Sequence, residues 1–263
     1  MRCTLLLAAA TFLFVAQPAS AGDEADTIKK AVLVPQKAAW EKHDFKAYLS
    51  QWADDCRVIS GRTEREDKHD VVLDRKQIEA TRRIRMSDVP RKGTKLVFES
   101  VEVKVDGDQA ELRALATLSF DGGYLLYADL YRLRKTPAGW KATLNRSWPL
   151  KLEFGGQARE FNAETWRALD AAVDELVRTD PRGDKAAEAL FAANRFAEEL
   201  ALRKRITARA DAAASDWVGR GFAALTVGDS EDAVAAFRQA LKLDAQAAVP
   251  QYVRGGKEER ERP

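Results

Sequence analysis

Phenol and carboxylate side chains alternate along residues 124–134. Tyr127, Asp129 and Tyr131 stand at odd-numbered positions and would share one face of a strand. A carboxylate held in an apolar pocket has a raised pKa, and neighbouring phenols can donate hydrogen bonds to a reacting group. These three residues are therefore the candidate catalytic set, with Asp129 as general base. The alternatives are that this face lies in solvent, or that Asp129 pairs with a basic residue of a neighbouring strand: Arg113, Lys141 or Arg146.

The following strand, expected at residues 140–148, carries a cation among aromatic side chains. Counting every second residue places Trp140, Arg146 and Trp148 on one face. Arg146 and Trp148 are therefore candidates for a ligand pocket that binds an anionic or aromatic molecule through charge and stacking. The alternative is that the tryptophans pack in the core or between domains.

Metal and covalent chemistry have little support in the sequence. His43 and His69 are the only histidines, and neither has a second ligand at the spacing of a zinc site. Neither a glycine-rich phosphate loop nor a Gly-x-Ser-x-Gly motif is present. We therefore predict no metal and no cofactor. Asp67, His69 and Asp70 are expected in a solvated loop.

Helices precede these strands. Apolar residues recur at helical spacing from residue 23 onward, and Pro35 is expected to bend or interrupt this first helix. His43 suits a left-handed or bridging conformation at its end, and Asp44 suits the N-cap of a second, short helix. Another helix is predicted around residues 75–85. Its three arginines are more typical of a solvated helix face than of an anion site: Arg82, Arg83 and Arg85.

Four successive strands are predicted at residues 96–105, 111–120, 124–134 and 140–148. Turn sequences separate them, of which Asp106-Gly107-Asp108 is the strongest hairpin signal. Meandering antiparallel strands preceded by helices indicate an α+β domain, in which the helices pack on one face of a curved sheet.

The pattern changes after Pro149. Gly155 and Gly156 close the first domain, and alanine-rich helical patterns follow with almost no strand signal. Helices are predicted at residues 163–178, 184–210, 215–227 and 230–243. The last residues are charged and led by glycine, which favours a disordered tail.

The first residues have the pattern of a secretory signal. A basic start at Arg2 precedes an apolar run at residues 5–15, and Ala19-Ser20-Ala21 provides a small-x-small cleavage site. We therefore expect a periplasmic or secreted protein that is soluble after cleavage. The formal net charge of +2 is close to neutral and argues against a nucleic-acid binder. Cys56 is the one cysteine outside the signal and is expected as a small buried side chain.

The first half resembles the nuclear transport factor 2-like superfamily, a cone-shaped α+β fold that includes ketosteroid isomerases and SnoaL-like polyketide cyclases. The resemblance covers about residues 25–152. It lies in the helical entry from Ala39 to Phe45, in Tyr48, in Ala53-Asp54-Asp55, in the turn from Val105 to Ala110 and in Gly139-Trp140-Lys141. It implies a ligand site between the concave face of the sheet and the helices, and dimerisation through the sheet. Within the superfamily, the chain looks most like exported, non-catalytic members.

The second half is similar to a tetratricopeptide repeat. The resemblance rests on a spaced set of signature residues: Trp217, Gly221, Ala233, Phe237 and Ala240. Gly228-Asp229 stands at the turn between the two helices, whereas Arg220, Ala224 and Ala245 depart from the usual pattern. A single repeat cannot bury its own apolar face, so the helices within residues 163–210 are expected to serve as degenerate repeats or as a cap. The resemblance implies a protein partner.

Together these patterns predict a signal peptide at 1–21, an α+β domain at 22–154, a helical domain at 157–248 and a charged, disordered tail at 249–263. The predicted function is that of an exported, non-catalytic binding or scaffold protein of the bacterial cell envelope, which binds a protein partner through the helical repeat region. The alternative is a small-molecule isomerase or cyclase-type enzyme, or a small-ligand binder, that uses the cone pocket.

Overall fold

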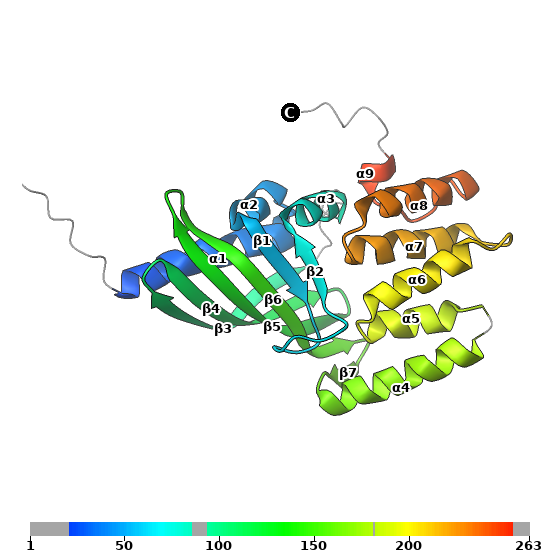
Figure 1. Ribbon diagram of the computed structural model, residues 1–263, viewed down its shortest axis with the longest axis horizontal. Coiled ribbons are helices and arrows are strands. Elements are labelled where there is room, and N and C mark those ends of the chain that lie inside the picture. Colours follow the sequence, from blue (N-terminus) through cyan, green and yellow to red (C-terminus); the bar gives the residue numbers. More distant parts are fainter. Residues whose placement is uncertain (1–20, 86–93, 181, 255–263) are drawn as a thin grey trace, which may run out of the picture.

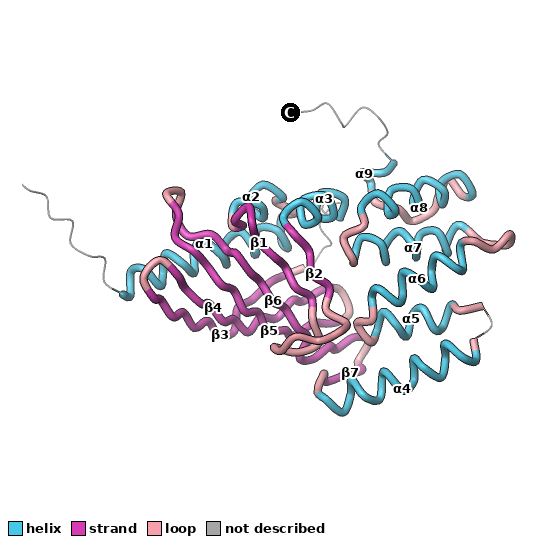
Figure 2. Tube along the Cα trace, in the orientation of Figure 1, coloured by secondary structure: helices cyan, strands magenta, loops and turns pink. Residues whose placement is uncertain are grey.

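The computed structural model describes residues 21–85, 94–180 and 182–254. The predicted signal peptide therefore lies outside the described residues, except for Ala21. The chain forms an α+β half, in which a curved sheet is covered by helices, and a helical half that stands beside one end of that sheet (Figure 1). Figure 2 shows that strands are confined to the first half and that the second half consists of helices and their turns.

The α+β half comprises α1 (Ala21–Lys42), α2 (Phe45–Ser50), β1 (Trp52–Ser60), β2 (Val71–Asp74), α3 (Arg75–Arg85), β3 (Lys95–Asp106), β4 (Gln109–Phe120), β5 (Gly123–Thr136), β6 (Gly139–Phe154) and β7 (Gln157–Glu160). The helical half comprises α4 (Ala163–Thr179), α5 (Asp184–Ala192), α6 (Phe196–Thr207), α7 (Ala214–Thr226), α8 (Ser230–Leu243) and α9 (Gln251–Arg254).

The strands form one sheet in the order β2-β1-β6-β5-β4-β3, with β7 paired to β6. The meander β3–β6 is antiparallel, as predicted. However, β1 pairs in parallel with β6, so the sheet is mixed rather than purely antiparallel. β6 is also longer than predicted, and after a turn β7 pairs antiparallel with its end. The sheet therefore ends at Glu160 instead of residue 154. The predicted α+β class, with N-terminal helices on a curved sheet, is confirmed.

Helix α1 covers the concave, inner face of the sheet. Ile28, Val32 and Ala39 are buried against this face, where they meet side chains such as Leu112 of β4. The helix continues through Pro35, so of the two predicted outcomes an interruption does not occur. Buried contacts before and after the proline hold both parts of the helix on the sheet, which offsets the loss of one backbone hydrogen bond. No described helix is long and apolar enough to span a bilayer.

The helix ends at a left-handed residue, as the sequence indicated. His43 has φ 53°, and the Asp44 carboxylate accepts a hydrogen bond from the backbone N–H of Ala47 at the start of α2. The helix α3 has the predicted bounds. β2, immediately before it, was not predicted, since four residues give too short a pattern.

The helical half departs from the prediction at two places. The helix expected at 184–210 is broken into α5 and α6 by a turn in which Asn194 has φ 52°. The tail expected from residue 249 is ordered at its start, because α9 packs on α8 and Val249 is 8 % exposed. Residues 255–263 of that predicted tail lie outside the described part of the chain.

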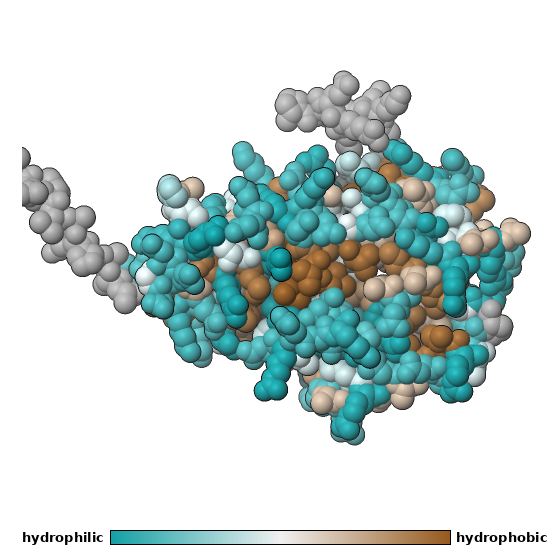
Figure 3. Space-filling view, viewed as in Figure 1, coloured by the Kyte–Doolittle hydropathy of each residue, from teal (hydrophilic) through white to brown (hydrophobic). Residues whose placement is uncertain are grey.

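Apolar side chains also reach the surface where the two halves meet. Figure 3 shows them as a band that runs from β1 and β2 toward the helices α5–α7. The exposed large apolar side chains of these elements are Val72 on β2, Phe191 on α5 and Phe222 on α7. We refer to the apolar surface over these elements as the apolar band.

Candidate functional site

The predicted acid–base residues lie on the inner face of β5. Strand register sets Ala114 of β4 opposite Asp129, and Ser147 of β6 on its other side. Tyr131 lies opposite Asn145 in the same way. The structure therefore brings Asp129 and Tyr131 together as predicted, and it adds Asn145 and Ser147, which sequence alternation along β5 could not reveal.

Asp129 is 4 % exposed and forms only uncharged hydrogen bonds. Its Oδ1 accepts hydrogen bonds from Asn145 Nδ2 at 3.2 Å and from the Ser147 hydroxyl, and its Oδ2 accepts one from the Tyr131 hydroxyl at 3.3 Å. Burial raises the pKa of the Asp129 carboxyl to about 6, although the three hydrogen bonds oppose the shift. None of the basic residues considered as partners pairs with it.

Tyr131 links this group to helix α1. Its hydroxyl accepts a hydrogen bond from Gln36 Nε2 at 2.9 Å, and its ring is 0 % exposed. We define the inner cluster as the five residues of this network: Gln36, Asp129, Tyr131, Asn145 and Ser147. Both Asp129 oxygens accept hydrogen bonds from within the cluster, so the cluster can hold a proton in a buried position.

Tyr127 lies two residues before Asp129 on the inner face of β5, and its burial and hydrogen bonding differ from those of Tyr131. It is half-buried beside Trp40 of α1, and its hydroxyl has no hydrogen-bond partner among the described residues. Burial, followed by the nearby Asp129 carboxylate, raises the pKa of the Tyr127 phenol. The Arg82 guanidinium of α3 lies 5.9 Å from the centre of the Trp40 ring. Tyr127 is therefore the least buried member of the predicted catalytic set.

Arg146 does not lie on the inner face, so the prediction that it shares a face with Trp140 is wrong. Leu133 pairs with Ala142 and Arg132 with Leu144, which leaves Thr143 as an extra residue in β6. This β-bulge reverses the alternation beyond it, so Trp140 stays inside whereas Arg146 and Trp148 point outward.

The Arg146 side chain is fully engaged on that outer face. Its Nη1 and Nη2 pair with the Asp70 carboxylate at 2.8 and 3.0 Å, and its Nε donates to the carbonyl of Thr63 at 3.0 Å. The guanidinium is 4 % exposed and holds the loop 61–70 on the sheet. Arg146 is thus a structural cation. Trp148 is half-buried on the same face.

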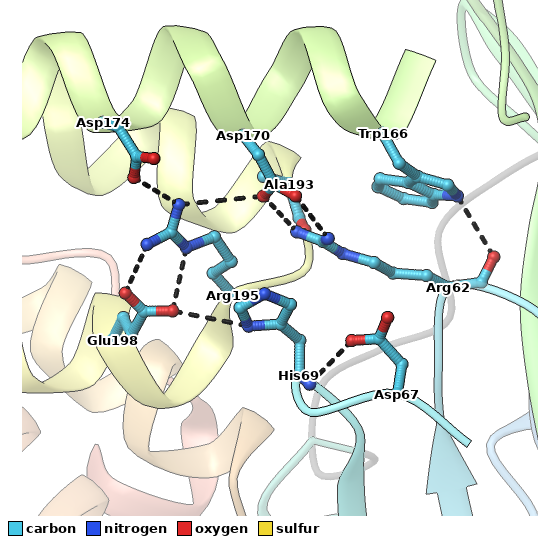
Figure 4. A network of polar contacts seen from close by, with 9 residues as sticks. All are labelled: Arg62, Asp67, His69, Trp166, Asp170, Asp174, Ala193, Arg195 and Glu198. Atoms are coloured by element: carbon cyan, nitrogen blue, oxygen red, sulfur yellow. Dashed lines mark hydrogen bonds and ion pairs between the residues drawn. The ribbon is translucent and has the colours of Figure 1, made fainter. Parts of the chain in front are cut away.

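The loop that was expected to be solvated joins the two halves. Arg62 Nη1 and Nη2 bind the Asp170 carboxylate of α4 at 2.9 and 2.7 Å, and its Nε donates to the carbonyl of Ala193 at 2.9 Å (Figure 4). Trp166 Nε1 donates to the Arg62 carbonyl at 3.2 Å, and its ring centre lies 5.0 Å from the guanidinium. We call these four residues the Arg62 clamp.

A second set of contacts lies beside the clamp. Arg195 Nη1 binds Asp174 at 2.8 Å and its Nη2 binds Glu198 at 2.6 Å, while His69 Nδ1 lies 3.4 Å from Glu198 (Figure 4). Burial, then the Arg62 charge, lowers the pKa of His69. No sequence signal marked this junction, because Arg62 and Asp170 are separated by 108 residues.

The repeat-signature residues lie where α7 and α8 cross. Ala233, Phe237 and Ala240 are buried in α8, and Trp217 packs at the edge of the same core. A methyl group on Gly221 would clash with the Phe237 ring, so this glycine allows the two helices to approach closely. Arg220, which departs from the repeat pattern, pairs with Asp232. The structure thus contains the expected close pair of helices, and the assignment to a tetratricopeptide repeat stays a prediction.

Metal ligation has no evident site in the described part of the chain. Residues 21–85, 94–180 and 182–254 contain no group of three or more His, Cys, Asp or Glu side chains arranged to hold an ion. Cys56 is buried, and burial raises the pKa of its thiol to about 11.

Comparison with solved structures finds bacterial proteins that are similar to about half of this chain. A candidate dehydratase of the nuclear transport factor 2-like family from Streptomyces avermitilis is 20 % identical, covers 49 % of this chain and 97 % of its own, and gives a TM-score of 0.39. A nuclear transport factor 2-like protein of unknown function from Shewanella oneidensis is 19 % identical over 47 % of this chain and 97 % of its own, with a TM-score of 0.39.

A candidate ketosteroid isomerase from Shewanella frigidimarina is 14 % identical over 47 % of this chain and 96 % of its own, with a TM-score of 0.37. These similarities concern the fold of about half the chain. No protein-family model matches the sequence, and comparison with curated proteins finds no relative.

Proposed function

We propose that this chain is an exported, non-catalytic binding protein that holds a protein partner against the surface shared by its two halves. The observation that carries the proposal is the apolar band (Figure 3), together with exposed apolar side chains on the elements along it: Val72, Phe191 and Phe222 are 48 %, 56 % and 45 % exposed. Exposed apolar surface contributed by separate elements is typical of an interaction site, since leaving it in water is unfavourable.

The Arg62 clamp supports this proposal. Val72 belongs to the α+β half, whereas Phe191 and Phe222 belong to the helical half. The buried ion pair between Arg62 and Asp170 fixes the two halves to each other. A partner would therefore meet a preformed surface and would lose less free energy to ordering it.

The inner cluster supports a non-catalytic role for the cone. Asp129 and Tyr131 are almost completely buried, and their polar atoms satisfy one another. A general base needs to reach a substrate proton within hydrogen-bond distance.

The partner would be a protein of the cell envelope, in keeping with the proposed export, and the chain itself could form a homodimer through its sheet.

The test uses residues 22–263 purified gently from the periplasm of the native host, with bound proteins identified by native mass spectrometry and cross-linking. The double variant Val72→Ser and Phe191→Ser should release the partner, because it removes two apolar contacts. Phe154→Ser is the matched control, since Phe154 is also exposed, at 58 %, but lies at the end of β6. Retention of the same partner by the double variant would refute the proposed surface.

A second candidate function is proton transfer on a small molecule within the cone. It is favoured by the raised pKa of Asp129, about 6, and by the Tyr127 hydroxyl, which has no hydrogen-bond partner among the described residues. A small molecule retained in native mass spectrometry by the wild type, and lost from both Tyr127→Phe and Asp129→Asn, would support it. A retained molecule that both variants bind as well as the wild type would exclude it.

A further inference from the structure

A groove lies on the surface between α3 of the α+β half and the helices α8 and α9. Its volume is about 650 Å³, and its walls come from α3, from the first half of α8 and from Tyr252 of α9. These walls are fixed to each other, because Ile84 of α3 is buried in the same apolar cluster as Phe237, and Arg85 Nη2 donates to the Thr226 hydroxyl at 2.8 Å. We refer to this cavity as the junction groove. It is separate from the apolar band and from the inner cluster.

The floor of the groove is apolar. Ile84 is 3 % exposed, Val234 is half-buried, and Tyr252 packs against the same core. Val234 and Arg238 stand four residues apart on α8 and therefore lie on one face of that helix. An apolar side chain from a ligand could replace water over Ile84 and Val234.

The rim of the groove has more available positive than negative charge. Arg83 and Glu79 pair with each other at 3.0 Å. Lys76 and Arg238 are exposed and form no ion pair with any described residue. Glu231, on the same rim, is also exposed and likewise forms no ion pair with a described residue. Two cations thus face one carboxylate, which favours a ligand with carboxylates beside an apolar group.

The shape of the groove favours a peptide over a small molecule. Lys76, Arg83, Glu231 and Arg238 are all exposed, so the walls are open to solvent and cannot enclose a ligand. Sites for small molecules usually bury most of the ligand surface. The chain's own residues 255–263 are a poor occupant, because they contain only glycine, lysine, glutamate, arginine and proline. They therefore have no large apolar side chain for the floor.

We propose that the junction groove binds an acidic peptide segment of a protein partner, with an apolar side chain of the segment against Ile84 and Val234 and its carboxylates paired with Lys76 and Arg238. The groove would then recognise a second region of a partner, or a different partner, from the one held at the apolar band.

The test measures fluorescence anisotropy of a labelled synthetic peptide of leucine, alanine and glutamate on the full chain. Two control peptides replace its glutamates by lysine or its leucines by serine. The junction variant is Lys76→Glu with Arg238→Glu. The matched control is Lys104→Glu with Lys242→Glu, which changes the net charge equally at two other exposed cations that have no ion pair among the described residues.

We expect the acidic peptide to bind the wild type and the charge-matched control alike. The junction variant should weaken binding roughly ten- to thirtyfold, because two rim attractions become repulsions. Added salt should weaken the wild-type complex, since rim charges are screened. Ala235→Trp, which places a large side chain on a groove-lining position, should also weaken binding.

The proposal is overturned if the lysine peptide binds as tightly as the acidic one, or if the junction variant, with an unchanged circular dichroism spectrum, binds as tightly as the wild type. Equal binding of the serine peptide would exclude the apolar anchor. Complete competition by decanoate would identify a small amphipathic carboxylate as the occupant instead of a peptide. The Val72→Ser, Phe191→Ser variant should bind the acidic peptide normally, so failure here is distinguishable from failure of the proposed function.

Discussion

Replacing Arg62 by methionine should loosen the helical half from the sheet and destabilise the protein. Methionine keeps an unbranched side chain of similar length but removes every hydrogen bond of the guanidinium. The Arg62 side chain is 4 % exposed and that of Asp170 is 33 % exposed. The substitution therefore removes a contact between the two halves, made by residues that are 108 positions apart in the sequence.

The expected loss can be worked from the contacts of the clamp. The Ala193 carbonyl would be left without its arginine donor in a buried position, which costs about 1–3 kcal/mol. Asp170 still reaches water and keeps Arg195 at 3.7 Å, so the lost ion pair is discounted to about 1 kcal/mol or less. The lost contact with the Trp166 ring adds about 0.5–1 kcal/mol. The free energy of unfolding should therefore fall by about 2–5 kcal/mol.

The assay is urea unfolding followed by circular dichroism and by tryptophan fluorescence. Coincident transitions would show that the two halves unfold together. Arg134→Met is the control, because Arg134 also binds a carboxylate with both terminal nitrogens, at 3.2 and 3.0 Å from Asp55. That pair is 50 % and 61 % exposed, so its loss should cost less than about 1 kcal/mol.

Equal losses in the two variants would refute this reasoning, because burial would then have no influence on the strength of the clamp. Arg62→Lys should fall between the wild type and Arg62→Met. Lysine keeps the charge, but it cannot bind both Asp170 oxygens and the Ala193 carbonyl at once.

Three further predictions concern single side chains. Asp129 has a folded-state pKa of about 6 against an ordinary 3.8, so the folded state binds more protons than the unfolded state between these pH values. The free energy of unfolding should therefore fall by about 3 kcal/mol as pH rises through this range. Asp129→Asn should abolish this pH dependence in unfolding titrations. Glu199, whose pKa burial raises to about 7 from 4.5, should likewise cost stability between pH 4.5 and 7, and thermal unfolding of Glu199→Gln should lack this decline. Gly221→Ala should lower the free energy of unfolding by about 1–3 kcal/mol because its methyl group clashes with Phe237. Gly219→Ala on the same helix meets the guanidinium end of the Arg203 side chain, which can shift more easily than a packed ring, and should cost less than about 1 kcal/mol in urea unfolding.

Local patterns were sufficient for much of the fold. The helix Arg75–Arg85, the N-cap at Asp44 and the left-handed His43 were all predicted, because propensity and turn chemistry act over a few residues. The same holds for the hairpins of the meander. The inward position shared by Asp129 and Tyr131 also follows from alternation along a single regular strand.

The sequence by itself determined most of the helices, the four strands of the meander, and which residues alternate along an uninterrupted strand. Only the tertiary structure decided the parallel pairing of β1 with β6, the bulge at Thr143 that turns Arg146 outward, and the Arg62–Asp170 pair. The physical reason is the separation in sequence between the residues that interact. Each of these features depends on which distant segment becomes a neighbour, and one extra residue in a strand is enough to exchange its two faces.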